Sequence, residues 1–462
     1  METIFYFIKK LIPSFIFKKI QPIYHWLING FSAVLYNFPS NKLIVIGVTG
    51  TTGKTTTVYF LAQILREAGI KAGYTSTAMF SDGKKDWLNN KKMTMLGRFF
   101  TQKMLRQMVN NKCQVAIIET TSEGIRQFRH RFINYDILVF TGIYPEHIES
   151  HGSFKNYKQA KLELFRHLEK HCHSKNLDKS FQKFYPLLKT IVVNGDDKYY
   201  KEFLNFSLSQ KIILQKTSFP QKITQKNQLT YFSYTPKEKN VFYFNQKKIA
   251  LKILGNFNIL NASLASSVAK VLKVKESVIK KGIEKINNIP GRIEKIQLGQ
   301  DFDVIVDYAF EPKALASLYK TILENFSPQK IIHILGATGG GRDKKRRKPL
   351  GEIAGKNADI VILTNEDPYD EDPIKIINEV AKGVKKFGKK ENKNLFLIEN
   401  RERAIEKGIQ LAEKNDLVLI TGKGSEQAIC IASGKKIPWD DRKIVSKKIK
   451  EKLKKLSNPI NK

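Results

Sequence analysis

Cysteine is scarce in this sequence. Three cysteines, Cys113, Cys172 and Cys430, occur in 462 residues, and they lie far apart with no CxxC pair. Such scattered thiols exclude a disulfide framework and a four-thiolate zinc site, and they fit the reduced interior of a cell. The short run His171-Cys172-His173 has a spacing that matches none of the usual zinc patterns.

Acidic residues are few relative to basic ones. The chain has 43 Asp and Glu against 80 Lys and Arg, which gives a formal net charge of +37. A field of this size attracts nucleic acid, anionic lipid or phosphorylated metabolites. The sequence has no long basic tail, however, and lacks the aromatic interleaving typical of RNA-binding segments. We therefore interpret the charge as solvated lysine surface and expect no nucleic-acid partner.

The N-terminal segment, residues 1–41, contains a stretch without charge. No Asp, Glu, Lys or Arg occurs from Ile20 to Asn41, whereas lysines precede it. Pro22, Asn29 and Gly30 interrupt the apolar run, which makes a membrane-spanning helix unfavourable, and a signal-peptide cleavage site is missing. Two interpretations stay open: an amphipathic helix at a membrane surface, or a helix docked on the body of the protein.

The rest of the chain predicts an α/β fold with two domains. Strands and helices alternate after Ser40, with buried strands at 43–48, 115–118, 137–140 and 191–193, while the segments 167–188 and 216–248 look like excursions from this pattern. A second series of five strand-helix units begins near Gly291. We expect a central P-loop domain with a parallel sheet over 42–289 and a C-terminal Rossmann-like domain over 290–462.

The strongest local motif lies between the first predicted strand and a helix over 55–68. It contains Gly50, Thr51, Thr52, Gly53, Lys54, Thr55 and Thr56. Backbone N–H groups of such a loop, together with the helix N-terminus, can hold phosphate oxygens. Lys54 supplies a charge for the β- and γ-phosphates, and the hydroxyl of Thr55 suits a Mg²⁺ ligand. The sequence therefore predicts binding of ATP with Mg²⁺.

The loop Gly50-Thr51-Thr52-Gly53-Lys54-Thr55 departs from a strict Walker A and resembles that of the Mur ligases and folylpolyglutamate synthases. Further motifs extend the resemblance over most of the chain. Glu119, at the end of a predicted strand, resembles the metal-binding Glu of the family, and residues 140–152 resemble a motif whose first histidine, here His147, helps to bind metal. The resemblance implies a metal site made by Thr55, Glu119 and His147, with His147 also in the catalytic set.

Other matches imply further site residues. Tyr157-xx-Ala160-Lys161-xx-Leu164-Phe165 resembles the motif whose lysine, here Lys161, carries a carbamate and joins the catalytic set with Lys54. Asn261 lies in a GxFNxxN-like motif, Arg292 in a GRxE-like hinge and Asp307 in a VDYA-like motif, and all three are implied to contact ATP. Phe310-Glu311 departs from the His-Thr of the family.

Two segments most resemble the branch of the family that adds the third residue of the peptidoglycan stem peptide. Residues 119–129 resemble its muramyl-peptide segment, which implies substrate contacts for Thr121, Gln127 and Arg129. Matches in the last domain imply an amino-acid site formed by Arg342, Glu366, Asp367, Gly422 and Glu426. Tyr369 stands where the diaminopimelate-adding form has Arg, and Ser425 replaces a His, so the identity of the added amino acid stays open.

The resemblance implies a cytoplasmic, monomeric, ATP- and Mg²⁺-dependent acid–amino-acid ligase. Its substrates would be UDP-N-acetylmuramoyl-L-alanyl-D-glutamate and a free amino acid, joined through an acyl phosphate. The usual first domain of this branch, which holds the uridine nucleotide, precedes the P-loop, where this sequence has only about forty residues. Peripheral membrane contact through residues 1–40 is one explanation that the sequence leaves open.

Three alternatives remain. A folylpolyglutamate synthase or another Mur-type ligase would act on a different carboxylate, and a lipid-modifying relative would usually carry a four-cysteine zinc ribbon. A nucleic-acid-dependent P-loop ATPase would use the basic run from Arg342 to Lys348. A catalytically idle scaffold is disfavoured because Glu119, His147 and Lys161 occur together with the loop.

Overall fold

The computed structural model describes residues 14–97, 99–146, 148–226, 229–341 and 344–457. The described chain forms two compact units, with the boundary between Asn287 and Asn288. Both units are α/β, which confirms the predicted fold class. In the described residues no helix has the length and hydropathy needed to cross a membrane.

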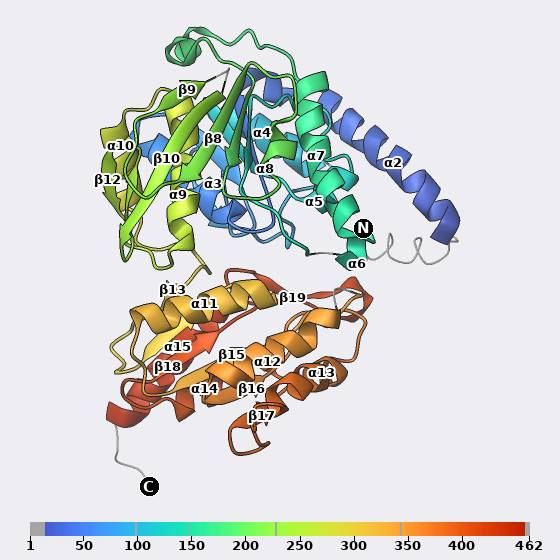
Figure 1. Cartoon of the computed structure of the whole chain (residues 1–462). Coiled ribbons are helices and arrows are strands. Elements are labelled where there is room, and N and C mark those ends of the chain that lie inside the picture. Colours follow the sequence, from blue (N-terminus) through green and yellow to red (C-terminus); the bar gives the residue numbers. More distant parts are fainter. Residues whose placement is uncertain (1–13, 98, 147, 227–228, 342–343, 458–462) are drawn as a thin grey trace. The chain divides into compact units, whose positions relative to one another are not determined.

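The first unit is built on one large mixed sheet (Figure 1). In spatial order its strands are β12 (Lys247–Ala250), β11 (Val241–Phe244), β10 (Leu229–Glu238), β8 (Gln210–Lys216), β7 (Thr190–Asn194), β6 (Ile137–Phe140), β1 (Ile44–Thr49), β5 (Val115–Glu119), β2 (Ala72–Thr75), β3 (Met79–Ser81) and β4 (Asp86–Leu88), and β9 (Thr224–Lys226) pairs with β10. The strands from β10 to β2 are parallel, and antiparallel strands extend both edges. The carboxyl ends of β1, β5 and β6 therefore lie side by side at the centre.

The strands at the centre of this sheet are apolar and fully buried. Every residue of β1, β5 and β6 is buried, as a parallel sheet covered on both faces requires. The helices of this unit are α2 (Ser14–Leu35), α3 (Lys54–Glu67), α4 (Phe99–Asn110), α5 (Ser122–Arg126), α6 (Ile148–His151), α7 (Phe154–His171), α8 (Tyr200–Leu204), α9 (Phe257–Val271) and α10 (Glu276–Glu284), with 3₁₀ turns η1 (Pro39–Lys42) and η2 (Lys179–Phe184). Among these, α3 packs against α9 and α10.

The predicted excursion over 216–248 was wrong in part. Its residues form β9, most of β10 and β11, and the start of β12, and β10 continues the parallel sheet beside β8. Several side chains of these strands are exposed or half-buried, and β9 is exposed along its whole length. Such edge strands lack the continuous apolar run that identifies a central strand.

The second unit has a six-stranded sheet within the described residues. Its order is β13 (Glu294–Lys295), β14 (Asp303–Val306), β18 (Leu417–Ile420), β15 (Ile331–Leu335), β16 (Ile360–Leu363) and β17 (Leu395–Leu397), parallel except for β13. A separate hairpin joins β19 (Ala428–Cys430) to β20 (Lys436–Pro438). The five parallel strands are those expected from the sequence.

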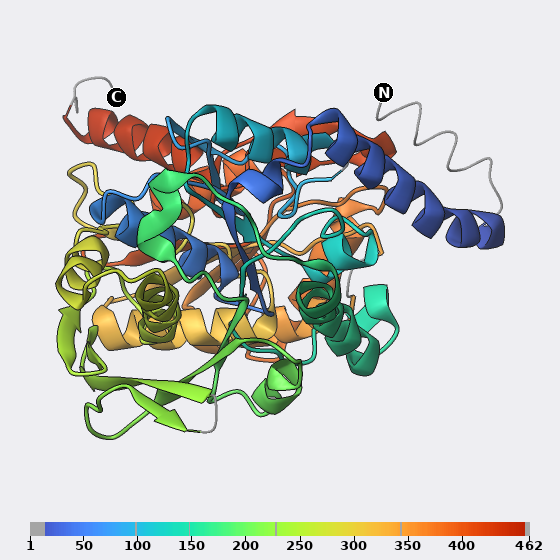
Figure 2. The ribbon, with the colours of Figure 1, turned by 90° about the horizontal axis from the view of Figure 1, so that it is seen from above.

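Helices cover both faces of this sheet (Figure 2). One core includes Leu315, Leu350 and Val380, and the other includes Ile405 and Val445. The corresponding helices are α11 (Pro312–Asn325), α12 (Arg347–Asn357) and α13 (Pro373–Lys385) on one face, and α14 (Arg401–Leu411) and α15 (Asp441–Ser457) on the other, with 3₁₀ turns η3 (Lys344–Arg346) and η4 (Ala432–Gly434). Loops that follow the carboxyl ends of the strands are thus left to form a site.

Candidate active site

The glycine-rich loop joins β1 to the N-terminus of α3. Gly53 has φ of +81°, and a side chain there would overlap Oδ1 of Asn261. Gly50 likewise has positive φ, and a side chain there would overlap Thr141. Backbone and packing therefore both require glycine at these positions. The N-terminus of a 14-residue helix lies directly behind the loop, where it favours an anion.

Neighbouring loops hold this loop in place. The hydroxyl of Thr141 donates to the carbonyl of Thr52 at 2.6 Å, and the amide of Thr51 donates to the carbonyl of Gly142 at 2.8 Å. Asn194 in turn donates to the carbonyl of Thr141 at 3.2 Å. Thr141 and Asn194 were not assigned roles from the sequence, although Thr141 follows buried strand β6 and Asn194 is the last residue of buried strand β7. They give the loop a fixed shape in the described structure.

Lys54 begins α3, and its Nζ donates to the carbonyl of Thr51 at 2.7 Å. Thr56, the last residue of the predicted loop, is buried in the first turn of α3. The ammonium of Lys54 thus lies over the loop that the sequence predicts to bind phosphate. A point charge in this position can neutralise phosphate oxygens.

Glu119, at the end of β5, lies beside the start of α3. Its carboxylate is 1% exposed and accepts a hydrogen bond from the hydroxyl of Thr55 at 2.9 Å. Thr77 also donates to it, from its amide at 2.8 Å and from its hydroxyl at 3.0 Å. The structure therefore brings Thr55 and Glu119 together, two oxygen donors of the kind that Mg²⁺ prefers. Thr77 was missed, although it follows the carboxyl end of β2.

His147, the third predicted metal ligand, lies outside the described residues. Within the described parts of the chain, no group of three His, Cys, Asp or Glu side chains is arranged to hold a metal ion. The donor set at Thr55 and Glu119 fits a magnesium that takes its other ligands from phosphate and water.

Lys161 projects from α7 toward the loop and is 1% exposed. Its Nζ donates to the carbonyl of Gly50 at 2.8 Å and lies 4.7 Å from the centre of the Tyr157 ring. Burial lowers the pKa of Lys161 well below its usual value, the nearby charge of Lys54 lowers it further, and Glu119 acts in the opposite direction. A buried neutral amine is the form that reacts with carbon dioxide, so the site suits the implied carbamate.

The three residues predicted to contact the muramyl peptide occupy one short segment. Thr121 caps α5 by accepting a hydrogen bond from the amide of Gly124 at 3.1 Å. Gln127 accepts from Arg129, whose guanidinium also donates to the carbonyl of Met95 at 2.5 Å. Gln127 and Arg129 thus lie together, whereas the hydroxyl of Thr121 has a capping role in the described structure.

His151 is a residue that the sequence analysis left without a role. It is buried, with Nε2 3.1 Å from Oγ of Ser122 and its ring 5.2 Å from that of Tyr157. Burial lowers its pKa to about 4, and Arg126 contributes in the same direction, so His151 is neutral at pH 7. The motif over residues 140–152 contains this histidine, which connects α5 to the lysine-bearing helix.

In the second unit, Arg292 precedes β13 and Asp307 follows the carboxyl end of β14. The guanidinium of Arg292 lies 4.3 Å from the centre of the Tyr308 ring. Buried Asp307 accepts hydrogen bonds from the amides of Ile293 and Ala309, both at 2.7 Å. Burial raises the pKa of Asp307, and Arg292 opposes this. Asp307 therefore fixes the turn that carries Arg292, and ATP contact stays a prediction for both.

Glu366, Asp367, Gly422 and Glu426 meet at the carboxyl ends of β16 and β18. Fully buried Lys423 joins two of them, since its Nζ donates to Asp367 at 3.0 Å and to Glu426 at 2.8 Å. The sequence analysis missed Lys423, although it stands inside the Gly422-to-Glu426 motif. Its charge compensates carboxylates that would otherwise be costly to bury.

One carboxylate oxygen of Glu366 is buried in this cluster without a hydrogen bond from the described residues. Oε1 accepts from the hydroxyl of Thr338 at 2.7 Å, whereas buried Oε2 accepts no hydrogen bond from any described residue. Burial raises the pKa of Glu366, and Asp367 adds to the rise. Gly422, with φ of +103°, lies so close that a side chain would overlap this carboxyl group. An incoming N–H donor would satisfy the buried oxygen. Arg342, also predicted here, lies outside the described residues.

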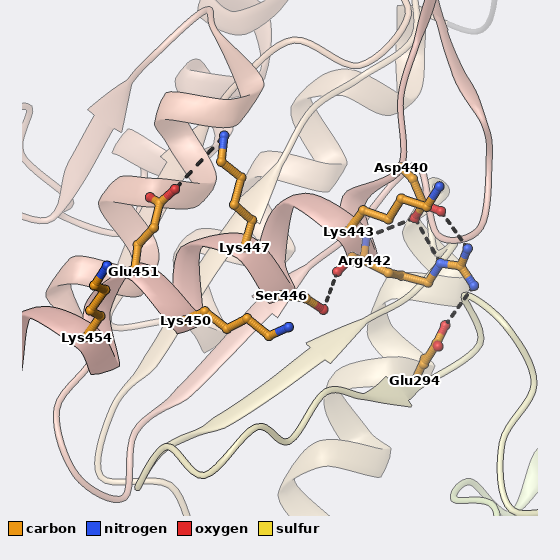
Figure 3. Close-up of a pocket in the computed structure, with 9 residues that line it drawn as sticks. All are labelled: Glu294, Asp440, Arg442, Lys443, Ser446, Lys447, Lys450, Glu451 and Lys454. Carbon is orange, nitrogen blue, oxygen red and sulfur yellow. Dashed lines mark hydrogen bonds and ion pairs between the residues drawn. The ribbon is translucent and has the colours of Figure 1, made fainter. Parts of the chain in front are cut away.

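A groove of about 610 Å³ elsewhere in the second unit is lined by none of the predicted site residues (Figure 3). It lies along α15 and is bordered by lysines and by Arg442, which contacts Asp440 at 2.7 Å and Glu294 at 3.6 Å. Figure 3 shows these three side chains joined at one end of the groove, and farther along α15 it shows Lys447 paired with Glu451. The groove is thus a basic surface of α15 and separate from the carboxylate cluster.

Comparison with protein families matches residues 48–269 to the Mur ligase middle domain and residues 291–424 to the Mur ligase glutamate ligase domain. The chain is 35% identical over 429 residues to a UDP-N-acetylmuramyl-tripeptide synthetase of Borreliella burgdorferi, covering 91% of this chain and 79% of that protein.

Two solved structures share the fold. A UDP-N-acetylmuramoyl-L-alanyl-D-glutamate--2,6-diaminopimelate ligase has a TM-score of 0.54 and 24% identity, covering 89% of this chain and 79% of that one. A folylpolyglutamate synthase of Mycobacterium tuberculosis has a TM-score of 0.63 and 14% identity, covering 86% of this chain and 92% of that one.

Proposed function

Since the chain belongs to the Mur ligase family of ATP-dependent ligases, we propose that it adds an amino acid to UDP-N-acetylmuramoyl-L-alanyl-D-glutamate in peptidoglycan biosynthesis. The reaction would take place in the cytoplasm and yield the third residue of the stem peptide. The main support is the convergence of Lys54, the Thr55–Glu119 pair and buried Lys161 on one loop. The name of the Borreliella burgdorferi relative, a tripeptide synthetase, supports the substrate class.

The proposed chemistry begins with transfer of the γ-phosphoryl group of ATP to the free carboxylate of the precursor. The resulting acyl phosphate is attacked by the amine of the amino acid, an amide forms and phosphate leaves. Lys54 and the loop amides would hold and neutralise the phosphates, with Asn261, Arg292 and Asp307 as further ATP contacts. Mg²⁺ bound by Thr55 and Glu119 would supply charge neutralisation at the phosphates.

Lys161 would add negative charge to the site once it carries a carbamate. Its amine is buried and its pKa is lowered, which supports reaction with carbon dioxide. The product is an anion at the end of a long stem, whose oxygens suit a second Mg²⁺. Gln127 and Arg129 would bind the muramyl peptide, where a paired guanidinium and amide suit carboxylate and carbonyl groups.

The amino acid would bind at the carboxylate cluster of the second unit. The buried Oε2 of Glu366 suits an ammonium, and Asp367 and Glu426 beside it share the single counter-charge of Lys423. Tyr369 stands where an arginine would grip a distal carboxylate, so we propose a diamino acid without that carboxylate, such as lysine or ornithine.

A ligation screen tests the proposal. The full chain is incubated with ATP, Mg²⁺ and UDP-N-acetylmuramoyl-L-alanyl-D-glutamate against a panel of amino acids, and the products are read by mass. We expect one amide product and release of phosphate that depends on the amine. A product only from folate and glutamate, offered in a parallel reaction, would instead assign a folylpolyglutamate synthase.

The variant Lys54→Ala should lower amine-dependent phosphate release on the order of 100-fold or more, because the charge over the phosphates is lost. Exposed Lys71 lies outside the loop, and Lys71→Ala is the matched control that should keep full turnover. Retained turnover in Lys54→Ala would overturn the assignment of the loop.

A further inference from the structure

In the described part of α2, large apolar side chains are exposed and small or polar side chains are buried. The face packed on the first unit carries small or polar buried side chains, Asn29, Ser32 and Ala33. Asn29 donates to the carbonyl of Gln127 at 3.3 Å. The rest of α2, called the α2 face below, leaves six large apolar residues 48–62% exposed, although the Trp26 ring also lies 5.4 Å from that of Phe132; these are Ile23, Trp26, Leu27, Phe31, Val34 and Leu35. Figure 1 shows α2 running along the outer side of this unit.

This arrangement is the reverse of an ordinary surface helix, which buries its apolar side chains and exposes charged ones. The sequence has no charged residue from Ile20 to Asn41, so the α2 face offers water no charged group of its own. Contiguous exposed apolar surface of this kind marks a place of contact with a partner or a membrane.

Neighbouring side chains extend the face and add positive charge. The ring of Phe31 lies 6.1 Å from that of Phe99 on α4, and Phe100 beside it is 44% exposed. Nζ of Lys91 lies 4.9 Å from the centre of the Phe100 ring. Exposed Lys103 follows Phe99 by one turn of α4, on the same side of that helix. The apolar face therefore has lysines at its border.

We propose that the α2 face docks on an anionic lipid bilayer, with α2 lying in the plane of the interface. Apolar side chains bordered by lysines match the acyl boundary and the anionic headgroups of such a surface. An exposed tryptophan suits the same interface. The 22-residue helix is about 33 Å long and would lie flat, since it does not qualify as a spanning helix.

Charge favours a bilayer over a second copy of the chain. The formal net charge is +37, so two copies joined through this face would bring together two strongly positive bodies. An anionic bilayer instead gains attraction from the same charge, by roughly 1 kcal/mol for each lysine near the surface.

A flotation assay with the full chain tests the proposal. Vesicles contain equal parts of phosphatidylglycerol and phosphatidylcholine, or phosphatidylcholine alone. We expect the chain to float with the anionic vesicles and much less with the neutral ones. The combined variant Ile23→Ser, Leu27→Ser and Val34→Ser should lower binding on the order of tenfold or more, because three exposed apolar side chains no longer insert.

Matched controls separate the face from general stickiness. Phe219→Ser and Leu323→Ser remove apolar side chains that are 73% and 57% exposed outside the α2 face, and they should leave binding unchanged. Lys91→Gln and Lys103→Gln should each lower binding to anionic vesicles by roughly fivefold, the equivalent of about 1 kcal/mol. Exposed Lys237 lies near the opposite edge of the sheet, and Lys237→Gln should have no effect.

Fluorescence of the unchanged chain gives a second measurement that needs no destabilising variant. Lipids brominated on their acyl chains should quench Trp26, and the conservative variant Trp26→Phe should lose that quenching. Undiminished flotation of the triple serine variant would overturn the proposal. So would dimers that the same variant converts to monomers while the unchanged chain ignores vesicles. Neither assay requires ligation, so the result is independent of the proposed reaction.

Discussion

Lys161 shows how one residue couples burial to chemistry. Its amine is enclosed beside Lys54 and Glu119, and its lowered pKa keeps it unprotonated over a pH range in which an exposed lysine is charged. In the unfolded chain the same amine binds a proton. The unfolded state therefore takes up more protons than the folded state between the lowered pKa and the ordinary one, and this difference makes stability depend on pH.

The sign of that dependence is a prediction. Stability of the nucleotide-free chain should rise as pH rises from the lowered pKa of Lys161 toward the ordinary pKa of a lysine, because the unfolded state loses its advantage in binding protons. The variant Lys161→Met should flatten this rise, which urea unfolding at several pH values measures. The same variant should also abolish ligation. Lys155, exposed on the same helix, gives the control Lys155→Met, which should keep the original slope. An unchanged slope in Lys161→Met would contradict the buried neutral amine.

At the scale of elements, a buried ion pair joins α14 to α15. The guanidinium of Arg401 contacts the carboxylate of Asp441 through two hydrogen bonds of 2.8 and 2.7 Å, and both side chains are at most 1% exposed. Arg401 also donates to the carbonyl of Thr421 at 2.8 Å, next to the motif that carries the carboxylate cluster. The pair thus fixes two helices and the end of β18 together.

Removing one partner should be severe. Arg401→Met leaves Asp441 buried without its counter-charge, and we expect a loss of about 3–5 kcal/mol in the free energy of unfolding. Urea unfolding measures this loss, and exposed Arg403 on the same helix provides the control Arg403→Met, expected within about 0.5 kcal/mol of the unchanged chain. A loss below about 1 kcal/mol in Arg401→Met would mean that the pair does not hold these helices.

The sequence predicts central elements better than edges. Fully buried strands such as β1 and β15 appear as apolar runs, and the loop residues from Gly50 to Thr56 are consecutive, so their joint placement follows from one motif. The edge strands β9 to β12 carry exposed side chains, and their pattern resembles that of a polar loop. Parallel pairing of β10 with β8 is a tertiary property that no local pattern encodes.

Contacts between residues far apart in the sequence limit how much of the site can be predicted. Thr77 meets Glu119 from the turn that follows β2, and Lys423 meets Asp367 across 56 positions, so neither partner can be identified from spacing alone. Thr121 lies in a recognisable motif, but its capping bond to Gly124 depends on where α5 begins. The motifs predict which residues lie in the site, whereas the structure shows which of them form hydrogen bonds with one another.

For the whole molecule, the net charge of +37 and the proposed reaction depend on different features of the structure. Positive charge attracts phosphates in general, including RNA, but this attraction is screened by salt and needs no specific site. The P-loop, the carboxylate Glu119 and the buried Lys161 are in contrast fixed by hydrogen bonds within one unit. Charge should therefore govern where the protein binds weakly, and the loop should govern when ATP is used.

This distinction predicts how the full chain responds to nucleic acid. RNA binding, measured by fluorescence anisotropy, should fall steeply between roughly 50 and 200 mM salt, as expected for contacts with phosphates alone. ATP turnover at the higher salt should depend on the muramyl precursor and the amine and should not respond to added RNA, because a diffuse field does not position the γ-phosphate for transfer. Poly-glutamate, an anionic polymer without bases, is the control for charge. Strong stimulation by RNA without precursor, not reproduced by poly-glutamate, would instead identify a nucleic-acid-dependent ATPase and would set the ligase assignment aside.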